Sequence, residues 1–556
     1  MRVLHTTRAL STLLALPLAL RTVLPGGTVE RMRRSSAFWL VASIAVAGCP
    51  PNVDPQCPEP LMTAAEKTSS SERYAELYRP RYHFSPERGW LSDPNGLIHL
   101  DGEWHLFFQH NPDEAMWGPM SWGHAVSTDL INWRPLPVAL RPHAQLGSVF
   151  SGTAVADRTN SSGLCGGPSC LVAVFTHAFG DDGQQKQSIA ASTDGGRTFT
   201  EYADNPVIPN PGLVDFRDPK VLWHAPTSRW VMALAAGDRA HFYTSPDLKS
   251  WTKVSELGPF DGLEGAWECP DLFPLALGGV EKWVFKLDRN VGLGEPDNMG
   301  FTMVGAFDGE RFVPETTPPG RRIDQGPDFY AAQSFNDAPD GRRVWLGWRE
   351  SWQYALGTPT DPWRGSMSIP RELSLVDDGA GPLLVQRPVP ELRALRGACP
   401  IASHASIDVS TGSSDALAGV EGDALEISLV VEPRDARSAG IGLRRGDGEE
   451  TRVGYDRERG VVFVDRTTSG DVLFASSFGA RFEAPMALRD GGMPLTIFVD
   501  RASVEVFADG GRAVLSVNIY PLPSSVGLAP FAEGGPARLR DVDVQRLADA
   551  TFTPAP

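Results

Sequence analysis

The chain has 556 residues and a formal net charge of −17, from 51 basic and 68 acidic side chains. Proteins that neutralise nucleic-acid phosphates carry an excess of basic side chains, so this charge argues against a nucleic-acid binder. The 56 glycines and 47 prolines are too few for a disordered chain but suit many short strands joined by turns, and they predict a globular, all-β protein.

The first 49 residues are predicted to direct export. Two apolar runs, 9–20 and 37–47, follow arginines, and neither reaches the roughly 20 residues needed to span a bilayer. The second run has the order of a signal peptide, and the residues 46–49 that close it match a bacterial lipobox, in which Cys49 is lipidated and becomes the mature N-terminus. The alternative is an ordinary secretory signal cut near Ala47-Gly48. Met32 is a second candidate start of translation.

Residues 50–79 are rich in Pro, Ser and Glu, which predicts a flexible tether. With a lipid on Cys49, the protein would be held at the bacterial cell envelope by that anchor alone. Without the lipid it would be secreted.

A short sequence motif recurs along residues 80–385: a strand, then Ser or Thr, then Asp, a turn and an aromatic residue. Its aspartates are Asp129, Asp194, Asp247 and, in a weaker copy, Asp308, about 60 residues apart. A period of this size with strand-like flanks indicates one propeller blade per repeat. This region is therefore predicted to be a five-bladed β-propeller, although convergent hairpins would produce the same spacing.

Cys165 and Cys170 bracket the tetrapeptide Gly-Gly-Pro-Ser, a turn that would close a small disulfide loop in an oxidising compartment. Zinc binding is the competing interpretation, but no second cysteine pair or close histidine pair completes a ligand set. The sequence therefore predicts a disulfide here, with neither a metal nor a cofactor.

The composition and the residue pattern of the sequence change after about residue 390. Tryptophan does not occur beyond Trp363, and alternating apolar and polar residues dominate, as in 425–431, 495–500 and 503–507. Period-2 alternation separated by Asp and Gly turns is typical of a β-sandwich, which is predicted over residues 390–548.

Three carboxylates stand in unusual local sequences of the propeller region. Asp93 and Asp218 each precede a proline at the start of a strand, and Glu268 lies between a tryptophan and a cysteine. Taken singly, Asp-Pro is a common turn starter and a lone Glu is usually solvated. The innermost strands of a propeller converge on one axial funnel, however, so acids on three blades can meet there. Paired carboxylates in aromatic surroundings are what cleavage of a glycosidic bond requires: one nucleophile and one acid with a raised pKa.

Over residues 79–545 the chain resembles glycoside hydrolase family 32, the fructan hydrolases and invertases. The resemblance is carried by segments 82–86 and 89–96, by 217–219, by 268–269 and by the strand pair 498–507. It implies a five-bladed propeller followed by a β-sandwich. It also implies that Asp93 is the nucleophile, Asp218 the stabiliser of the transition state and Glu268 the acid/base.

The same resemblance implies which residues bind the fructosyl unit. They are Ser92, Asn95, Gln109, Trp117, Phe150, Ser151, Arg217 and Trp352. Ser92 departs from the family pattern, which has Asn immediately before the nucleophile. Asn offers an amide donor and an acceptor, whereas Ser offers one shorter hydroxyl. A looser hold on the fructosyl unit would favour transfer to a sugar over hydrolysis; the alternative is a tolerated variant.

Two further segments, 120–127 and 352–373, are similar to exo-acting levanases and inulinases. The resemblance therefore implies a retaining hydrolase that removes terminal β-fructosyl units from levan or inulin, and from sucrose. A fructosyltransferase or an invertase would use the same site. A surface glycan-binding lipoprotein would keep the aromatic residues but need not keep the three acids, so the intact trio argues against it.

Overall fold

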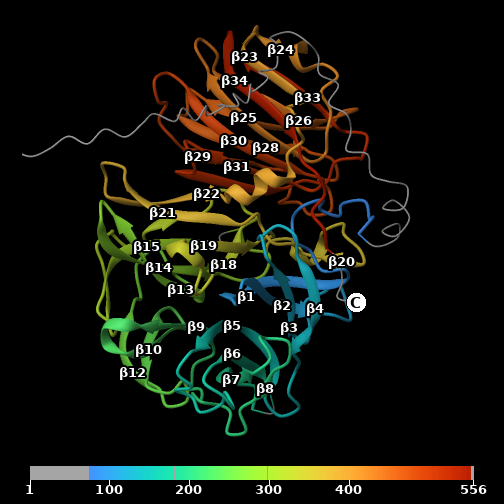
Figure 1. Cartoon of the computed structure of the whole chain (residues 1–556). Coiled ribbons are helices and arrows are strands. Elements are labelled where there is room, and N and C mark those ends of the chain that lie inside the picture. Colours follow the sequence, from blue (N-terminus) through green and yellow to red (C-terminus); the bar gives the residue numbers. More distant parts are fainter. Residues whose placement is uncertain (1–73, 181, 297, 553–556) are drawn as a thin grey trace, which may run out of the picture. The chain divides into compact units, whose positions relative to one another are not determined.

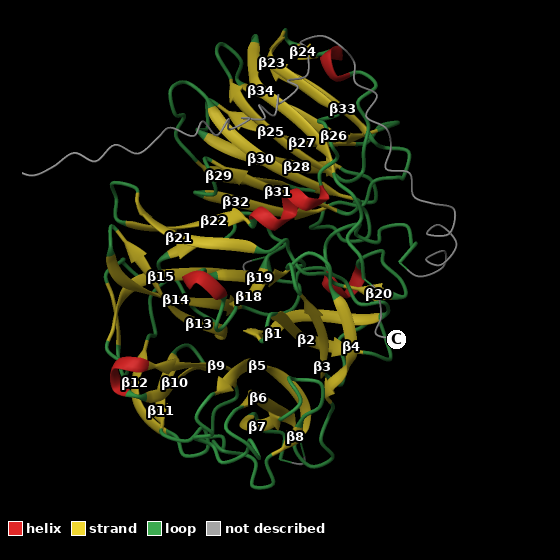
Figure 2. Ribbon diagram, in the orientation of Figure 1, coloured by secondary structure: helices red, strands yellow, loops and turns green. Residues whose placement is uncertain are grey.

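The computed structural model describes residues 74–552 except 181 and 297, so the predicted export region, Cys49 and most of the predicted tether lie outside the described residues. The described chain is built almost entirely of strands, with a few short 3₁₀ helices between them (Figure 2). The helices are η1 (Ala225–Thr227), η2 (Pro339–Gly341), η3 (Ala355–Gly357), η4 (Pro390–Leu395) and η5 (Asp415–Leu417). No helix in this part of the chain is long and apolar enough to cross a membrane.

Five sheets of four or five strands follow one another along the first part of the described chain (blue to yellow in Figure 1). Their strands are β1 (Gly89–Leu100), β2 (Glu103–Asn111), β3 (Ser121–Ser127), β4 (Arg134–Leu140), β5 (Gly147–Asp157), β6 (Cys170–Phe179), β7 (Lys186–Ser192), β8 (Thr200–Glu201), β9 (Phe216–His224), β10 (Arg229–Ala236), β11 (Ala240–Ser245), β12 (Thr252–Leu257), β13 (Ala266–Leu277), β14 (Val280–Asn290), β15 (Met299–Phe307), β16 (Phe312–Pro314), β17 (Arg321–Arg322), β18 (Tyr330–Ser334), β19 (Val344–Trp348), β20 (Trp363–Arg364), β21 (Arg371–Asp377) and β22 (Pro382–Pro388).

The first strands of these sheets close a ring. The strands β1, β5, β9, β13 and β18 each contact the next in this order, and β18 contacts β1 again. The late strand β20 also pairs in parallel with the start of β1, which joins the two ends of the ring. A ring of sheets whose first strands surround one axis is a β-propeller.

The recurring sequence motif occupies the same place in four of the five sheets, namely the turn between the third strand and the fourth. Asp129 accepts main-chain hydrogen bonds from Ile131 and Asn132 at 2.9 and 2.8 Å, and Asp247 accepts the equivalent pair at 3.0 and 2.7 Å. Asp194 and Asp308 likewise cap the turns that follow β7 and β15. An Asp side chain that satisfies its own turn is a local device that each sheet can repeat.

Two six-stranded antiparallel sheets form the C-terminal part (orange to red in Figure 1). Their strands are β23 (Ala402–Val409), β24 (Gly412–Ser413), β25 (Leu425–Glu432), β26 (Ser438–Arg445), β27 (Glu450–Asp456), β28 (Val461–Thr468), β29 (Arg481–Pro485), β30 (Met493–Asp500), β31 (Ser503–Ala508), β32 (Ala513–Asn518), β33 (Gly527–Glu533) and β34 (Ala537–Arg546). The alternation seen in the sequence is used directly, because Leu425, Ile427, Leu429 and Val431 of β25 all enter one core built from both sheets. The predicted all-β fold, a propeller followed by a β-sandwich, is confirmed.

Buried polar contacts join the two parts. His83, just before β1, lies between Asp500 and Glu505 of the sandwich, with both ring nitrogens 2.8 Å from a carboxylate oxygen. Arg371 of β21 reaches Glu505 at 2.5 Å and Asp324 at 3.0 Å. These side chains are fully or almost fully buried, so each charge depends on its partner.

Candidate active site

Each first strand of the propeller carries a β-bulge at the same place, where two of its residues oppose one residue of the neighbouring strand. The paired residues are Ser92-Asp93 in β1, Phe150-Ser151 in β5, Asp218-Pro219 in β9, Cys269-Pro270 in β13 and Ala331-Ala332 in β18. Backbone φ is positive at Asp218 (65°), Cys269 (45°) and Ala331 (53°). A bulge bends its strand and re-aims the side chains beside it, so the ring of bulges positions residues from separate sheets around one pocket.

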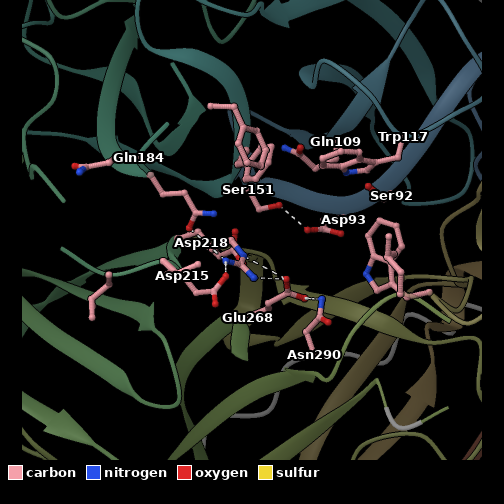
Figure 3. Close-up of a pocket in the computed structure, with 18 of the residues that line it drawn as sticks. Ser92, Asp93, Gln109, Trp117, Ser151, Gln184, Asp215, Asp218, Glu268 and Asn290 are labelled. Atoms are coloured by element: carbon pink, nitrogen blue, oxygen red, sulfur yellow. Dashed lines mark hydrogen bonds and ion pairs between the residues drawn. The ribbon is translucent and has the colours of Figure 1, made fainter. Parts of the chain in front are cut away.

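Asp93, Asp218 and Glu268 line a single cavity of about 690 Å³ (Figure 3). Seven of the eight predicted substrate-binding residues line the same cavity: Ser92, Gln109, Trp117, Phe150, Ser151, Arg217 and Trp352. Asn95 is the exception. Its side chain is fully buried and accepts a hydrogen bond from the Gly152 main chain at 3.2 Å, so it supports the bulge of β5, and it is not among the residues that line the cavity.

The side chains of Asp93 and Asp218 are linked through Cys269. The Cys269 thiol lies 3.5 Å from Asp93 Oδ2 and 3.6 Å from Asp218 Oδ2, and the Cys269 main-chain N–H donates to Asp218 at 2.9 Å. Ser151 Oγ donates to Asp93 at 2.6 Å. Burial, opposed by the Ser151 hydrogen bond and reinforced by the charge of Glu268, raises the pKa of Asp93 to about 6. Burial also raises the pKa of Asp218, against the opposing charge of Arg217.

Glu268 is held at both carboxylate oxygens. Arg217 Nη2 donates to Oε1 at 2.7 Å, while Tyr330 Oη and Asn290 Nδ2 donate to Oε2 at 2.6 and 3.1 Å. Arg217 is itself held by Asp215 and lies 3.9 Å from Asp218. One guanidinium therefore hydrogen-bonds Glu268 and lies within ion-pair distance of Asp218.

Sequence reasoning missed the residues that hold this arrangement: Asp215, Asn290, Tyr330 and Gln185, whose side-chain oxygen accepts from Arg217 Nη1 at 3.3 Å. Tyr330 immediately precedes the bulge of β18, as Glu268 precedes that of β13. Its hydrogen bond to Glu268 depends on the ring of bulges, which no local sequence motif predicts. Only Asp215, two residues before Arg217, lay close enough to a recognised motif to be found.

A further pair of charges lies beside Glu268. Asp288 of β14 is opposite Glu268 in the β13–β14 register and forms an ion pair with Lys286. The Lys286 ammonium also donates a hydrogen bond to the Cys269 carbonyl at 3.0 Å. Burial, opposed by the charge of Lys286, raises the pKa of Asp288 to about 7. Lys286 thus fixes the main chain at the Cys269 bulge.

Outside the pocket, Cys165 and Cys170 form a disulfide with an S–S distance of 2.16 Å. Among the described residues, no group of three or more His, Cys, Asp or Glu side chains is placed to hold a metal ion.

Comparison with known proteins places this pocket in a family. Residues 83–388 match the model of the glycosyl hydrolases family 32 N-terminal domain, and residues 391–546 match the family 32 C-terminal model. The chain belongs to glycosyl hydrolase family 32 and is a glycoside hydrolase. The resemblance inferred from the motifs is confirmed.

Similar proteins agree along most of the chain. It is 46% identical over 498 residues to a levanase of Bacillus subtilis (strain 168), an alignment that covers 87% of this chain and 73% of the levanase. It is 39% identical over 514 residues to an extracellular exo-inulinase of Aspergillus awamori, covering 85% and 95% of the two chains. The crystal structure of an A. awamori exo-inulinase superposes with a TM-score of 0.80 at 38% identity, covering 86% of this chain and 99% of that one.

Proposed function

We propose that the protein is a retaining β-fructosidase that removes terminal β-fructosyl units from fructans such as levan and inulin, and also cleaves sucrose. The observation that carries the proposal is the set of three carboxylates placed in one cavity by corresponding bulges of three sheets. The similarity to a levanase and an exo-inulinase supports the choice of a fructosyl substrate.

In this mechanism Asp93 attacks C2 of the fructosyl unit while Glu268 gives its proton to the departing oxygen. Glu268 then takes a proton from the water that releases fructose, so the configuration is retained. Retention needs the two carboxyl groups roughly 5–5.5 Å apart. Asp93 on β1 and Glu268 on β13 belong to sheets separated in the ring by that of β18, and both side chains line the same cavity. Tyr330 and Asn290 would keep Glu268 aimed at the leaving oxygen throughout.

Asp218 is assigned to the transition state. With Oδ2 held by the Cys269 main chain and Arg217 nearby, it would hydrogen-bond fructose hydroxyls most strongly as the sugar becomes oxocarbenium-like. An interaction that strengthens in the transition state accelerates the reaction, whereas equal binding of the ground state does not.

The test is a comparison of initial rates of fructose release by the purified protein from levan, inulin and sucrose, with NMR detection of the first anomer formed. Fructose release from the chain ends with the β anomer first is the expected result. Release of the α anomer first would contradict retention, and products formed mainly by transfer at high sucrose would indicate a fructosyltransferase.

We also propose that the protein is exported and that its mature chain begins at a lipid-modified Cys49, on the strength of the lipobox sequence at 46–49. Cys49→Ser is then expected to release the enzyme from the membrane fraction or to block its processing. A mature N-terminus at any other residue, without lipid, would overturn the anchor and leave a secreted enzyme.

A further inference from the structure

The mouth of the cavity is apolar. Seven of the side chains that line it are exposed, and six of these are large and apolar, the seventh being Gln184. The six, which we call the collar, are Met116, Trp117, Phe179, Val214, Leu293 and Leu356, with exposed fractions from 38% for Leu356 to 89% for Val214. Exposed apolar side chains gathered around a pocket are a mark of a ligand-binding surface, whereas isolated ones need no explanation.

The two aromatic rings of the collar, Trp117 and Phe179, pack with a third ring, Phe150, of the cavity lining. The ring centroids of Trp117 and Phe179 are 6.3 Å apart, and both contact Phe150, which lies deeper in the cavity, at 6.2 and 5.1 Å. The ring planes meet at 64° to 85°, so neighbouring rings do not form one flat platform. Such a surface suits a hydrocarbon chain better than the broad face of a second sugar ring.

Contacts from other loops continue the collar past these rings. Arg364 Nη1 reaches Met116 Sδ at 3.0 Å and the Leu356 carbonyl at 2.6 Å, which holds these two apolar residues together. The Gly294 main chain donates to the Trp352 carbonyl at 3.2 Å and brings the adjacent Leu293 to the same rim. These contacts link the loops that carry Met116, Leu356 and Leu293 at the rim of the cavity.

The collar reaches the side of the pocket where a leaving group departs. Val214 precedes Arg217 by three residues, and Leu293 follows Asn290 by three. Arg217 and Asn290 are the side chains that hold Glu268, the acid assigned to the leaving oxygen. A group attached to that oxygen would therefore emerge between Val214 and Leu293.

We propose that the collar is a binding site for an apolar aglycone, so that the enzyme also hydrolyses alkyl β-fructosides and favours longer alkyl chains. The proposal rests on the proposed function for the fructosyl half of the substrate. In the reaction the C2–O bond breaks, the alcohol leaves with the proton from Glu268, and water supplies the hydroxyl and the proton that restore fructose and the acid.

The test measures binding and turnover separately on the full chain. Binding of methyl, butyl and hexyl β-D-fructofuranoside is measured by titration calorimetry with Asp93→Asn, which prevents turnover during the titration. A fully buried methylene strengthens binding about fourfold, and one half-covered by an open mouth about twofold. Hexyl has five more methylenes than methyl and is therefore expected to bind about thirtyfold more tightly, with a more negative heat capacity change.

Two collar substitutions and a matched control locate the effect. Combining Val214→Ser and Leu293→Ser with Asp93→Asn is expected to remove most of the dependence on chain length. Leu473→Ser is the control, because Leu473 is 91% exposed but does not line the cavity, and it should leave that dependence unchanged.

Equal affinities for methyl and hexyl fructoside, no binding of either, or a chain-length dependence that survives the collar substitutions would each overturn the aglycone site. Fructose release by the unmodified enzyme is a separate readout. Failure to release fructose from methyl fructoside and from levan, alongside chain-length-dependent binding, would overturn the proposed function and leave the apolar site standing.

Discussion

The pocket and the boundary between propeller and sandwich each gather buried carboxylates, but they bond them differently. At the boundary, Asp500 accepts from His83 and from the main chain of Arg81, Tyr82 and Arg501. Burial alone would raise its pKa, but these hydrogen bonds lower it to about 2. In the pocket, the described side chains within hydrogen-bond reach of the Asp93 carboxylate are Ser151 and the weakly donating Cys269, and its pKa is raised to about 6.

The contrast separates two uses of buried charge. Glu505 at the boundary behaves like Asp500. Burial raises the pKa of Glu505, but the charges of Arg371 and His83 outweigh that effect and lower the pKa to about 2. Such acids are ionised at neutral pH and fix how the two parts meet. Asp93 and Asp218 keep lone pairs unsatisfied, as the roles proposed for them require, and their charged forms are correspondingly costly.

The largest expected effect is on the pocket. Asp93→Asn and Glu268→Gln are each expected to lower turnover by at least about a thousandfold with the fold intact, because nucleophile and acid/base act as a unit. Steady-state rates on a fructan and circular dichroism check this. Glu268→Gln should retain more activity on an activated fructoside whose leaving group needs no proton; equal losses on both substrates would contradict the acid/base assignment.

Substitutions at the boundary between propeller and sandwich are expected to lower the stability of the fold. Arg371→Met leaves Glu505 and Asp324 buried without their cation, and breaking a buried pair in this way costs about 3–5 kcal/mol. The measurement is the unfolding midpoint in denaturant, with kcat of the folded enzyme near that of the unmodified protein.

Arg342→Met is the matched control, since the ion pairs of Arg342 with Glu372 and Glu391 are partly exposed to solvent and should contribute at most about 1 kcal/mol. Similar losses of stability in the two variants would show that burial does not distinguish the boundary from the surface.

Acid should inactivate the pocket before it unfolds the boundary. Asp93 must be ionised to attack, so kcat/KM is expected to fall about tenfold per pH unit below about 6. Asp500 and Glu505 have lowered pKa values, so their contribution to stability is full above the unfolded-state pKa of about 4 and is lost as pH falls toward about 2. Activity and circular dichroism measured from pH 8 to pH 3 would separate the two events, and their coincidence would refute the contrast.

Removing the buried charge of Asp93 should also stabilise the fold. The pKa of Asp93 is raised, so its stabilising contribution is full below the unfolded-state value and is lost as pH rises through about 6. Asp93→Asn is therefore expected to raise the free energy of unfolding by about 1–2 kcal/mol at pH 8, a value reduced by the partial exposure of the side chain, and to change little at pH 4. An Asn variant that is less stable at pH 8 would show that the charge is well accommodated.

The sequence predicted the parts of this picture that local patterns encode. The period of the Asp turns indicated the propeller, alternation indicated the sandwich, and Asp-Pro and Glu-Cys marked strands whose bulges line the pocket. Tyr330, Asn290 and the collar residues other than Trp117 came only with the structure, since their positions depend on how the sheets close into a ring. The placement of Asn95 also needed the fold, because a residue two positions from a nucleophile can lie on either face of a bulged strand.

The smallest expected effect comes from making the pocket slightly more like the boundary. Ser92 is buried at the bulge beside Asp93 and lines the cavity. Ser92→Asn offers one more donor to the neighbouring carboxylate or fructosyl unit, worth about 0.5–1.5 kcal/mol, so a severalfold rise in the ratio of hydrolysis to transfer at high sucrose is the most that is expected. The free glucose and fructose formed from sucrose give that ratio directly. Ser92→Ala is the control, since it removes the hydroxyl without adding a donor. An unchanged ratio in Ser92→Asn would mean that the sparse bonding of Asp93 does not set the choice between water and sugar as acceptor, and that the departure from Asn is neutral.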